Sequence, residues 1–175
     1  YVGQYLPDWR PDDDYRAGYS AIKAQGGGVL RDLSHELDFA IHIAGGAREV
    51  TALGGKLSNL EIDSDDVFSI LMRTAHCPSV CVSMNYLDTK LHREFVVHTD
   101  KGTLRANMAT SEFSDGGKMS HVPSERNESY TDMHRAAMEG DTRVLCGLQE
   151  AERVQELIAA IERASAGPEW VLLNP

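Results

Sequence analysis

A run of short apolar segments between residues 49 and 113 most constrains what this chain can fold into. The segments carry the apolar runs and period-2 alternation that are typical of β-strands. They are residues 50–53, 67–72, 80–86, 94–98 and 103–106. Thr99–Gly102 separates the last two and is predicted to form a hairpin turn with glycine at its end. Because parallel pairing requires long crossover connections, these short connections favour an antiparallel sheet.

Helices are predicted on both sides of this strand region. A helix is expected after Gly26–Gly28 and is expected to end at Gly45–Gly46. Its apolar stripe consists of Leu30, Leu33, Leu37, Ile41 and Ala44. Further helices are expected at residues 129–138 and 149–164, followed by a final strand at 170–173. The polar segment Phe113–Asn127 is predicted to be a loop.

These elements define an α+β fold, an open and mainly antiparallel sheet with helices collected on one face. The length of 175 residues corresponds to a single domain spanning the whole chain. Such a sheet exposes its other face, and we expect another subunit to cover it, although solvent can do so as well.

The composition limits the classes of partner. With 42% hydrophobic residues the chain can bury a core, and its net charge of −10 disfavours a nucleic-acid or membrane-surface partner. Three cysteines cannot all pair with one another, so reduced thiols and a cytoplasmic location are expected. We expect neither a metal site nor a membrane span.

The start of the chain indicates a fragment of a longer protein. The first residue is Tyr1, and the segment that it opens, residues 1–6, already resembles a strand. A chain rarely begins inside a structural element, so we expect further sequence before Tyr1.

One helix carries polar residues suited to proton transfer. At 100° per residue, Arg31, His35, Asp38 and His42 lie opposite the apolar stripe. A carboxylate one turn from an imidazole can fix its tautomer and raise its basicity, and Asp38 and Asp32 are both candidates for that role. The alternative interpretation is a solvated helix face.

A loop near the start of the chain combines aromatic and basic residues. Residues 7–16 are rich in proline and aspartate, which predicts an ordered loop. The candidate ligands of a sugar-like substrate are Trp9, Arg10, Arg16 and Tyr19. Aromatic faces stack on sugar rings and guanidinium groups bind carboxylate or phosphate. Packing and surface charge explain the same residues equally well.

The glycine run does not predict a dinucleotide site. Gly26–Gly28 precedes a helix, but no strand runs directly into it, and residues 29–32 contain no further glycine. The G-x-G-x-x-G spacing is therefore not met. We expect these glycines to provide backbone freedom where the loop meets the helix.

Residues 26–38, read as Gly-Gly-Gly-Val-Leu-Arg-Asp-Leu-Ser-His-Glu-Leu-Asp, resemble the signature helix of the Gfo/Idh/MocA oxidoreductases. Glucose–fructose oxidoreductase and inositol dehydrogenase belong to this family. Further similarity lies in the Tyr15-Arg16-x-x-Tyr19-Ser20-Ala21 segment, in the Gly102-Thr103-Leu104 turn and in the closing helix and strand. We call residues 26–38 the signature segment.

The resemblance implies the C-terminal, substrate-binding half of an NAD(P)-dependent enzyme that acts on a sugar, sugar acid or cyclitol. This half has a fold like the substrate domain of glyceraldehyde-3-phosphate dehydrogenase and often forms the oligomer interface. In the family a separate N-terminal Rossmann domain binds NAD or NADP and contributes a catalytic lysine. We expect neither cofactor to bind to this chain by itself.

The resemblance also implies roles for individual residues. His35 matches the family histidine and would exchange the hydroxyl proton during hydride transfer, held by Asp38 or Asp32. Asp32 stands three residues before His35, whereas the common spacing in the family is four. Arg16 and Tyr19 would position the substrate, with Trp9 and Arg10 beside them.

Two other functions fit the same sequence. One is a free-standing sugar-binding or assembly domain without redox activity. The other is a hydrolase or isomerase of the same family that uses the nicotinamide only transiently. The coding sequence upstream of Tyr1 distinguishes the first of these from a dehydrogenase.

Overall fold

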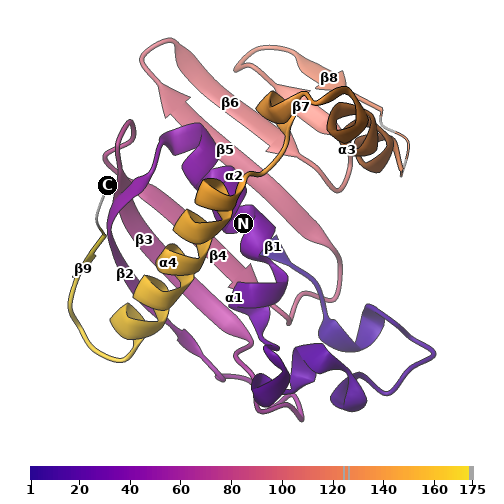
Figure 1. Ribbon diagram of the computed structural model, residues 1–175, viewed down its shortest axis with the longest axis vertical. Helices are drawn as coiled ribbons and strands as arrows, with labels where there is room; N and C mark the ends of the chain where they lie inside the picture. Colours follow the sequence, from indigo (N-terminus) through magenta and orange to yellow (C-terminus); the bar gives the residue numbers. More distant parts are fainter. Residues whose placement is uncertain (124, 126, 174–175) are drawn as a thin grey trace. The chain divides into compact units, whose positions relative to one another are not determined.

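The computed structural model of the chain describes residues 1–123, 125 and 127–173. It divides into two compact units (Figure 1). The first unit consists of Tyr1–His92 and Glu152–Pro175, and the second consists of Arg93–Ala151.

The first unit contains a five-stranded sheet with the order β1-β4-β3-β2-β9. Its strands are β1 (Val2–Gly3), β2 (Ala47–Gly55), β3 (Val67–Thr74), β4 (Val80–Asn85) and β9 (Val171–Leu172). Every neighbouring pair is antiparallel except β1 and β4, which are parallel. The predicted open, mainly antiparallel sheet is therefore confirmed, and β1 is shorter than the predicted strand over residues 1–6.

Alternation along the strands separates a buried face of this sheet from an exposed one. In β3, Phe68, Ile70 and Met72 are buried, whereas Ser69 and Leu71 between them are exposed. Successive side chains of a strand point to opposite faces, so the buried set faces the helices. This pattern is the physical origin of the sequence signal in the strand region.

Three helices cover one face of the sheet (Figure 1). They are α1 (Val29–Asp32), α2 (Ser34–Ala44) and α4 (Leu148–Ser165), of which α4 starts in the residues of the second unit. Leu30, Leu37 and Leu157 are fully buried beneath them. Burial of one such side chain stabilises the fold by about 1.5–3 kcal/mol. The predicted placement of the helices on one face is confirmed.

The helix predicted after Gly26–Gly28 is not continuous. It breaks at Leu33, whose φ of −104° and ψ of 23° lie outside helical values, and α2 begins at the next residue. Leu30 before the break and Leu37 after it are both fully buried. Both helices therefore apply apolar residues to the sheet, although a single helical wheel does not carry through Leu33.

The second unit is an antiparallel meander followed by a helix. Its strands are β5 (His92–Thr99), β6 (Gly102–Asn107), β7 (Glu112–Ser114) and β8 (Met119–His121), and its helix is α3 (Glu128–Glu139). Thr99 pairs with Gly102, so the predicted hairpin turn is confirmed. Gly102 has a φ of +143°, which a residue with a Cβ rarely adopts.

The prediction of a loop over Phe113–Asn127 is only partly correct. This range holds most of β7 and all of β8, which pair in register from Glu112 with His121 to Ser114 with Met119. Each strand has three residues, too few for alternation to be recognised in a Ser- and Gly-rich sequence. Ser124 and Arg126, within the same prediction, lie outside the described residues.

Candidate active site

The glycine run at the start of α1 packs against the chain itself. A Cβ on Gly27 would lie 2.1 Å from the backbone oxygen of Tyr19 and 2.6 Å from that of Ser20. Gly28 has a φ of +125°, and a Cβ there would lie 2.2 Å from Oδ2 of Asp65. The glycines thus allow the start of α1 to pack closely against residues 19–20 and against Asp65.

Asp65 occupies the N-terminus of α1. Its backbone oxygen accepts a hydrogen bond from Val29 N at 3.0 Å, and its Oδ1 accepts one from Leu30 N at 3.0 Å. Burial raises the pKa of the Asp65 carboxyl above its ordinary value, against the lowering effect of the Leu30 N–H. The amides that a phosphate group would use at this helix end already have partners.

The described residues therefore do not fit a dinucleotide at the glycine run. Backbone of residues 19–20 fills the space beside Gly27, and Asp65 places a carboxylate where a pyrophosphate would need donors. The glycine run therefore offers no site for the pyrophosphate of NAD or NADP. The structure agrees with the expectation that the glycines give the backbone freedom.

Substitution of Gly27 by alanine tests this close approach. We expect Gly27→Ala to lower the free energy of unfolding by about 1–3 kcal/mol, because the methyl group would overlap rigid backbone. Gly26→Ala is the matched control: no atom lies within 4 Å of its Cβ position, and only its φ of +83° opposes the change. Urea unfolding of both variants makes the comparison. Equal losses at the two positions would contradict the packing argument.

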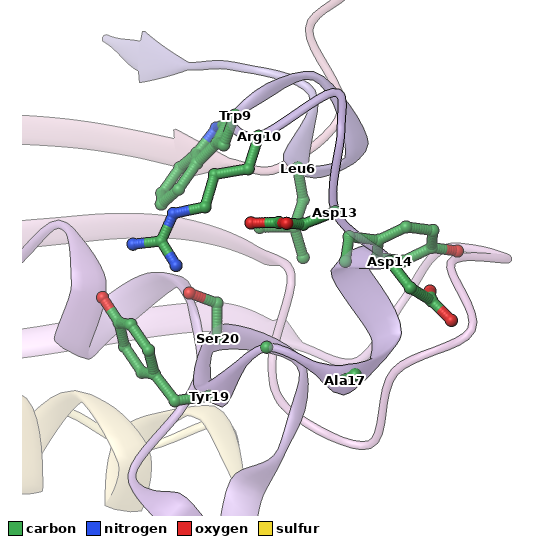
Figure 2. A pocket seen from close by; sticks show the side chains of 10 residues that line it. Leu6, Trp9, Arg10, Asp13, Asp14, Ala17, Tyr19 and Ser20 are labelled. Atoms are coloured by element: carbon green, nitrogen blue, oxygen red, sulfur yellow. The ribbon is translucent and has the colours of Figure 1, made fainter.

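A pocket of about 310 Å³ opens beside the loop that contains Trp9. Figure 2 shows the side chains of Trp9, Arg10 and Tyr19 reaching toward the same opening, with Asp13 and Ser20 nearby. Three of the four predicted substrate ligands are thus brought together. Among the described residues Arg10 has no ion pair, so its guanidinium keeps its donors for a ligand.

Tyr86 connects this pocket to the signature segment. Its ring contacts the indole of Trp9 edge to face, with ring centroids 5.3 Å apart. Its hydroxyl donates a hydrogen bond of 2.6 Å to Oδ2 of Asp32. Burial and the bond to Asp32 raise the pKa of Tyr86 far above its ordinary value, so the hydroxyl remains a donor. Asp32, whose role the sequence leaves open, is therefore the acceptor in this contact.

Tyr86 is not among the predicted site residues, because its position with His92 and Arg93 near a turn between strands favours a structural role. It directly follows β4 and lies 54 positions from Asp32, so only the fold brings the two together. The one available signal is chemical: a tyrosine at the end of a buried strand usually finds a polar partner for its hydroxyl.

His35 lies in the first turn of α2 with its side chain 57% exposed. Its Nε2 is 3.1 Å from Oε1 of Glu36, a carboxylate that is only 10% exposed. Within the described part of the chain, no hydrogen bond joins His35 to Asp38 or Asp32. The carboxylate next to the imidazole is thus Glu36, which the helical-wheel argument could not identify because adjacent residues point about 100° apart.

Arg16 makes intramolecular ion pairs instead of lining the pocket. Its Nε lies 2.8 Å from Oδ1 of Asp14, and its Nη1 lies 3.2 Å from Oε2 of Glu61. The hydrogen bond from Arg16 lowers the pKa of the Asp14 carboxyl. Arg31, on the predicted polar face, pairs with Glu162 of α4 at 2.7 Å. His42 at the end of α2 is exposed.

Two further features are absent from the described residues. No group of three or more His, Cys, Asp and Glu side chains among them is arranged to hold a metal ion. None of their helices combines the length and the apolar character that a membrane crossing requires.

The described residues of the first unit form an α+β domain with an open, mainly antiparallel sheet and helices on one face. The sequence profile described as "GFO/IDH/MocA C-terminal domain" matches residues 2–105. The chain belongs to this family, as the signature segment predicts.

Solved structures share the fold over almost the entire chain. GenD2 from gentamicin A biosynthesis, in complex with NAD, is 22% identical with a TM-score of 0.76, covering 99% of this chain and 54% of that one. The WlbA dehydrogenase from Bordetella pertussis, in complex with NADH and UDP-GlcNAcA, is 16% identical with a TM-score of 0.75, covering 99% and 56%. Levoglucosan dehydrogenase, in complex with NADH and levoglucosan, is 18% identical with a TM-score of 0.75, covering 99% and 57%.

The chain thus spans a little over half the length of these relatives. At such identities the likeness establishes the fold. A comparison with curated proteins finds no match.

Proposed function

We propose that this chain is the substrate-binding half of an NAD(P)-dependent oxidoreductase that acts on a sugar, sugar acid or cyclitol by hydride transfer. The observation that carries the proposal is the contact series from Trp9 through Tyr86 to Asp32, which links the pocket wall to the signature segment. The relatives bound to NAD or NADH support the choice of cofactor. A separate nucleotide-binding domain would hold that cofactor.

His35 is the proposed proton carrier. Its imidazole is half-exposed and therefore open to a hydroxyl group of a bound substrate, and the Glu36 carboxylate beside Nε2 would help to orient the ring. The Asp32 carboxylate, fixed by the Tyr86 hydroxyl, would hold the start of α2 in place relative to the pocket wall. Asp38 remains a proposed second partner of the imidazole on substrate binding.

The pocket is the proposed sugar site. The indole of Trp9 offers an apolar face for a sugar ring, and the Tyr19 hydroxyl and Arg10 guanidinium offer polar contacts around it (Figure 2). Arg16 is proposed only as an indirect contributor, since direct binding through it would require exchange of two ion pairs.

The exposed face of the first unit's sheet is the proposed oligomer contact. Leu53 and Leu71 are 72% and 45% exposed there, on the side of the sheet opposite to the buried strand residues. A second subunit would remove both side chains from water. A cytoplasmic location is proposed with this arrangement.

A substrate screen tests the proposed activity. The full-length protein would be assayed with NAD and NADP against neutral sugars, sugar acids and cyclitols, with formation of the reduced nicotinamide followed by absorbance. We expect turnover with at least one member of these three classes. Sugar binding without any reduction of either cofactor would instead support a binding or assembly domain.

The two arginines of the loop give a matched pair of variants. We expect Arg10→Gln to raise KM for the preferred substrate by about 10-fold, because one charge-assisted hydrogen bond would be lost. Arg16→Gln should change KM by less than about threefold, since its guanidinium is already engaged. A larger effect from Arg16→Gln than from Arg10→Gln would contradict this assignment of roles.

A further inference from the structure

A second cavity, of about 410 Å³, lies in the first unit where β2 begins and β3 ends. Its charged lining residues are Arg48, Glu49, Arg73 and His76. It shares no lining residue with the pocket beside Trp9. Neither the signature segment nor the proposed oxidoreductase function assigns a role to it.

The lining carries an excess of positive charge. Two arginines and one glutamate give a net charge of about +1 before His76 is counted, in a chain whose total charge is −10. Within the described residues Arg48 has no ion pair, so its five N–H donors are available. An isolated basic cavity on an acidic protein attracts small anions.

Arg73 makes two contacts that restrain its guanidinium group, although its side chain is 63% exposed. Its Nη1 lies 2.6 Å from Oε1 of Glu49, and its Cζ lies 5.5 Å from the ring centroid of Trp170. The contact with the indole face restrains the planar guanidinium while leaving its remaining N–H groups uncommitted. A ligand would therefore meet a guanidinium group whose motion is already restricted, so that less side-chain entropy would be lost on binding.

Another part of the cavity wall is the turn after β3, residues 74–78, which hydrogen bonds connect to the end of α2. Thr74 N donates to Cys77 O at 3.0 Å, His76 N donates to Ala44 O at 3.0 Å, and Ala75 N donates to Gly46 O at 2.9 Å. Ala44 O also accepts from the Thr74 hydroxyl, so this helix-terminal carbonyl already has two donors.

The His76 ring is fixed by its contact with Gly45. A Cβ on Gly45 would lie only 2.7 Å from Cδ2 of His76, so the ring rests directly on the glycine. Gly45 has a φ of +83°, a second reason for glycine at this position. The imidazole therefore lies against Gly45 in the lining of the cavity, where a ring N–H can donate to an anion.

We propose that this cavity binds a compact dianion, a small phosphate or dicarboxylate compound, between the guanidinium groups of Arg48 and Arg73 with His76 at the rim. Guanidinium groups bind carboxylate and phosphate oxygens in pairs, which suits a ligand of this size and charge. The site is independent of the pocket beside Trp9 and of the reaction proposed there.

Calorimetric titration of the protein with inorganic phosphate and with malonate tests the site and distinguishes the two ligand types. We expect saturable binding of at least one of them, half-complete at or below about 1 mM at constant ionic strength. Arg48→Gln should weaken it at least about 10-fold, and Arg48→Lys should weaken it less, because lysine keeps the charge but loses the paired donors. Arg48 is exposed, so both variants should keep the far-ultraviolet dichroism of the wild type.

Arg10→Gln in the other pocket is the control and should leave the anion affinity unchanged. Three results would overturn the proposal. They are the absence of saturable binding of either anion up to about 10 mM, an Arg48→Gln affinity equal to that of the wild type, and loss of binding in Arg10→Gln, which would place the anion beside Trp9.

Discussion

His35→Ala in the full-length protein should lower kcat by roughly 10²–10⁴-fold, the range expected when a proton-transfer group is removed. The imidazole is 57% exposed in the first turn of α2, with the Glu36 carboxylate 3.1 Å from its Nε2. Alanine leaves this helix turn intact but offers no group that can exchange the substrate proton. The measurement is steady-state kinetics with the substrate identified by the screen, using either nicotinamide.

His42→Ala is the matched control for this prediction. His42 is an exposed histidine of the same helix, two turns further along, and it has no proposed role in the reaction. Its removal should leave kcat within about twofold of the wild type. Unchanged kcat in His35→Ala, or equal losses in the two variants, would remove His35 from the proposed mechanism.

Glu36→Gln separates the effect of the neighbouring carboxylate from that of the imidazole. Glutamine keeps the size of the side chain but removes the charge beside Nε2. If the Glu36 carboxylate orients the imidazole for proton exchange, kcat should fall by about 10-fold in this variant while KM stays within about twofold of the wild type. A purely structural role for Glu36 would change stability and leave kcat in place.

Local signals were sufficient to predict most elements of this fold. The alternation in β3, with Phe68, Ile70 and Met72 on one face, is visible in the sequence because strand periodicity depends only on neighbouring residues. The stripe through Leu30, Leu37 and Ile41 is visible for the same reason. The three-residue strands β7 and β8 were missed because two or three alternations do not stand out from a polar loop.

The details of the site depend on contacts between distant segments, which a single sequence does not reveal. The break at Leu33 has no signal in the sequence, because the apolar stripe continues from Leu30 before it to Leu37 after it. The Tyr86 hydroxyl meets Asp32 across 54 positions. Arg16 forms an ion pair with Glu61, which lies 45 positions away in the sequence. The sequence alone therefore could not show that this arginine is already paired.

The link between fold and site is clearest at Asp65, which the sequence does not single out. Its backbone oxygen and its carboxylate accept hydrogen bonds from the first two backbone N–H groups of α1. Gly28 has no side chain and therefore leaves room for that carboxylate. The glycine run and an aspartate 37 positions later therefore act together to direct the signature segment onto the sheet. Sequence resemblance located the segment, and the geometry explains why it needs its glycines.

Asp66→Ala should produce the largest loss of stability, about 3–5 kcal/mol, because it removes a fully buried carboxylate that accepts several hydrogen bonds and pairs with the partly exposed Lys56. Asp66 is 0% exposed. Its carboxylate accepts hydrogen bonds from Leu57 N at 2.7 Å and from the Ser58 hydroxyl at 2.6 Å, and it lies 3.0 Å from Lys56 Nζ. These donors belong to the connection between β2 and β3, which would be left with unsatisfied N–H groups. The expected fall in Tm is roughly 6–20 °C.

The pH dependence of this loss provides a second readout. Burial by itself raises the pKa of Asp66, but the N–H groups of Leu57 and Ser58, the Ser58 hydroxyl and Lys56 together lower it below the ordinary value. A carboxyl whose pKa is lowered by folding stabilises the native state above its unfolded pKa of about 3.9 and loses that contribution as the pH falls through the folded value. The stability difference between wild type and Asp66→Ala should therefore be largest near pH 7 and shrink below about pH 4.

Asp63→Asn is the matched control for Asp66. Asp63 lies in the same connection and accepts a hydrogen bond from Lys23 N at 2.7 Å, but it is exposed. Asparagine keeps an acceptor oxygen, so the change in the free energy of unfolding should stay below about 1 kcal/mol. Urea unfolding at pH 7 and pH 3 compares the variants. A difference between wild type and Asp66→Ala that is the same at both pH values would show that the lost contacts, rather than the charge of Asp66, stabilise this connection.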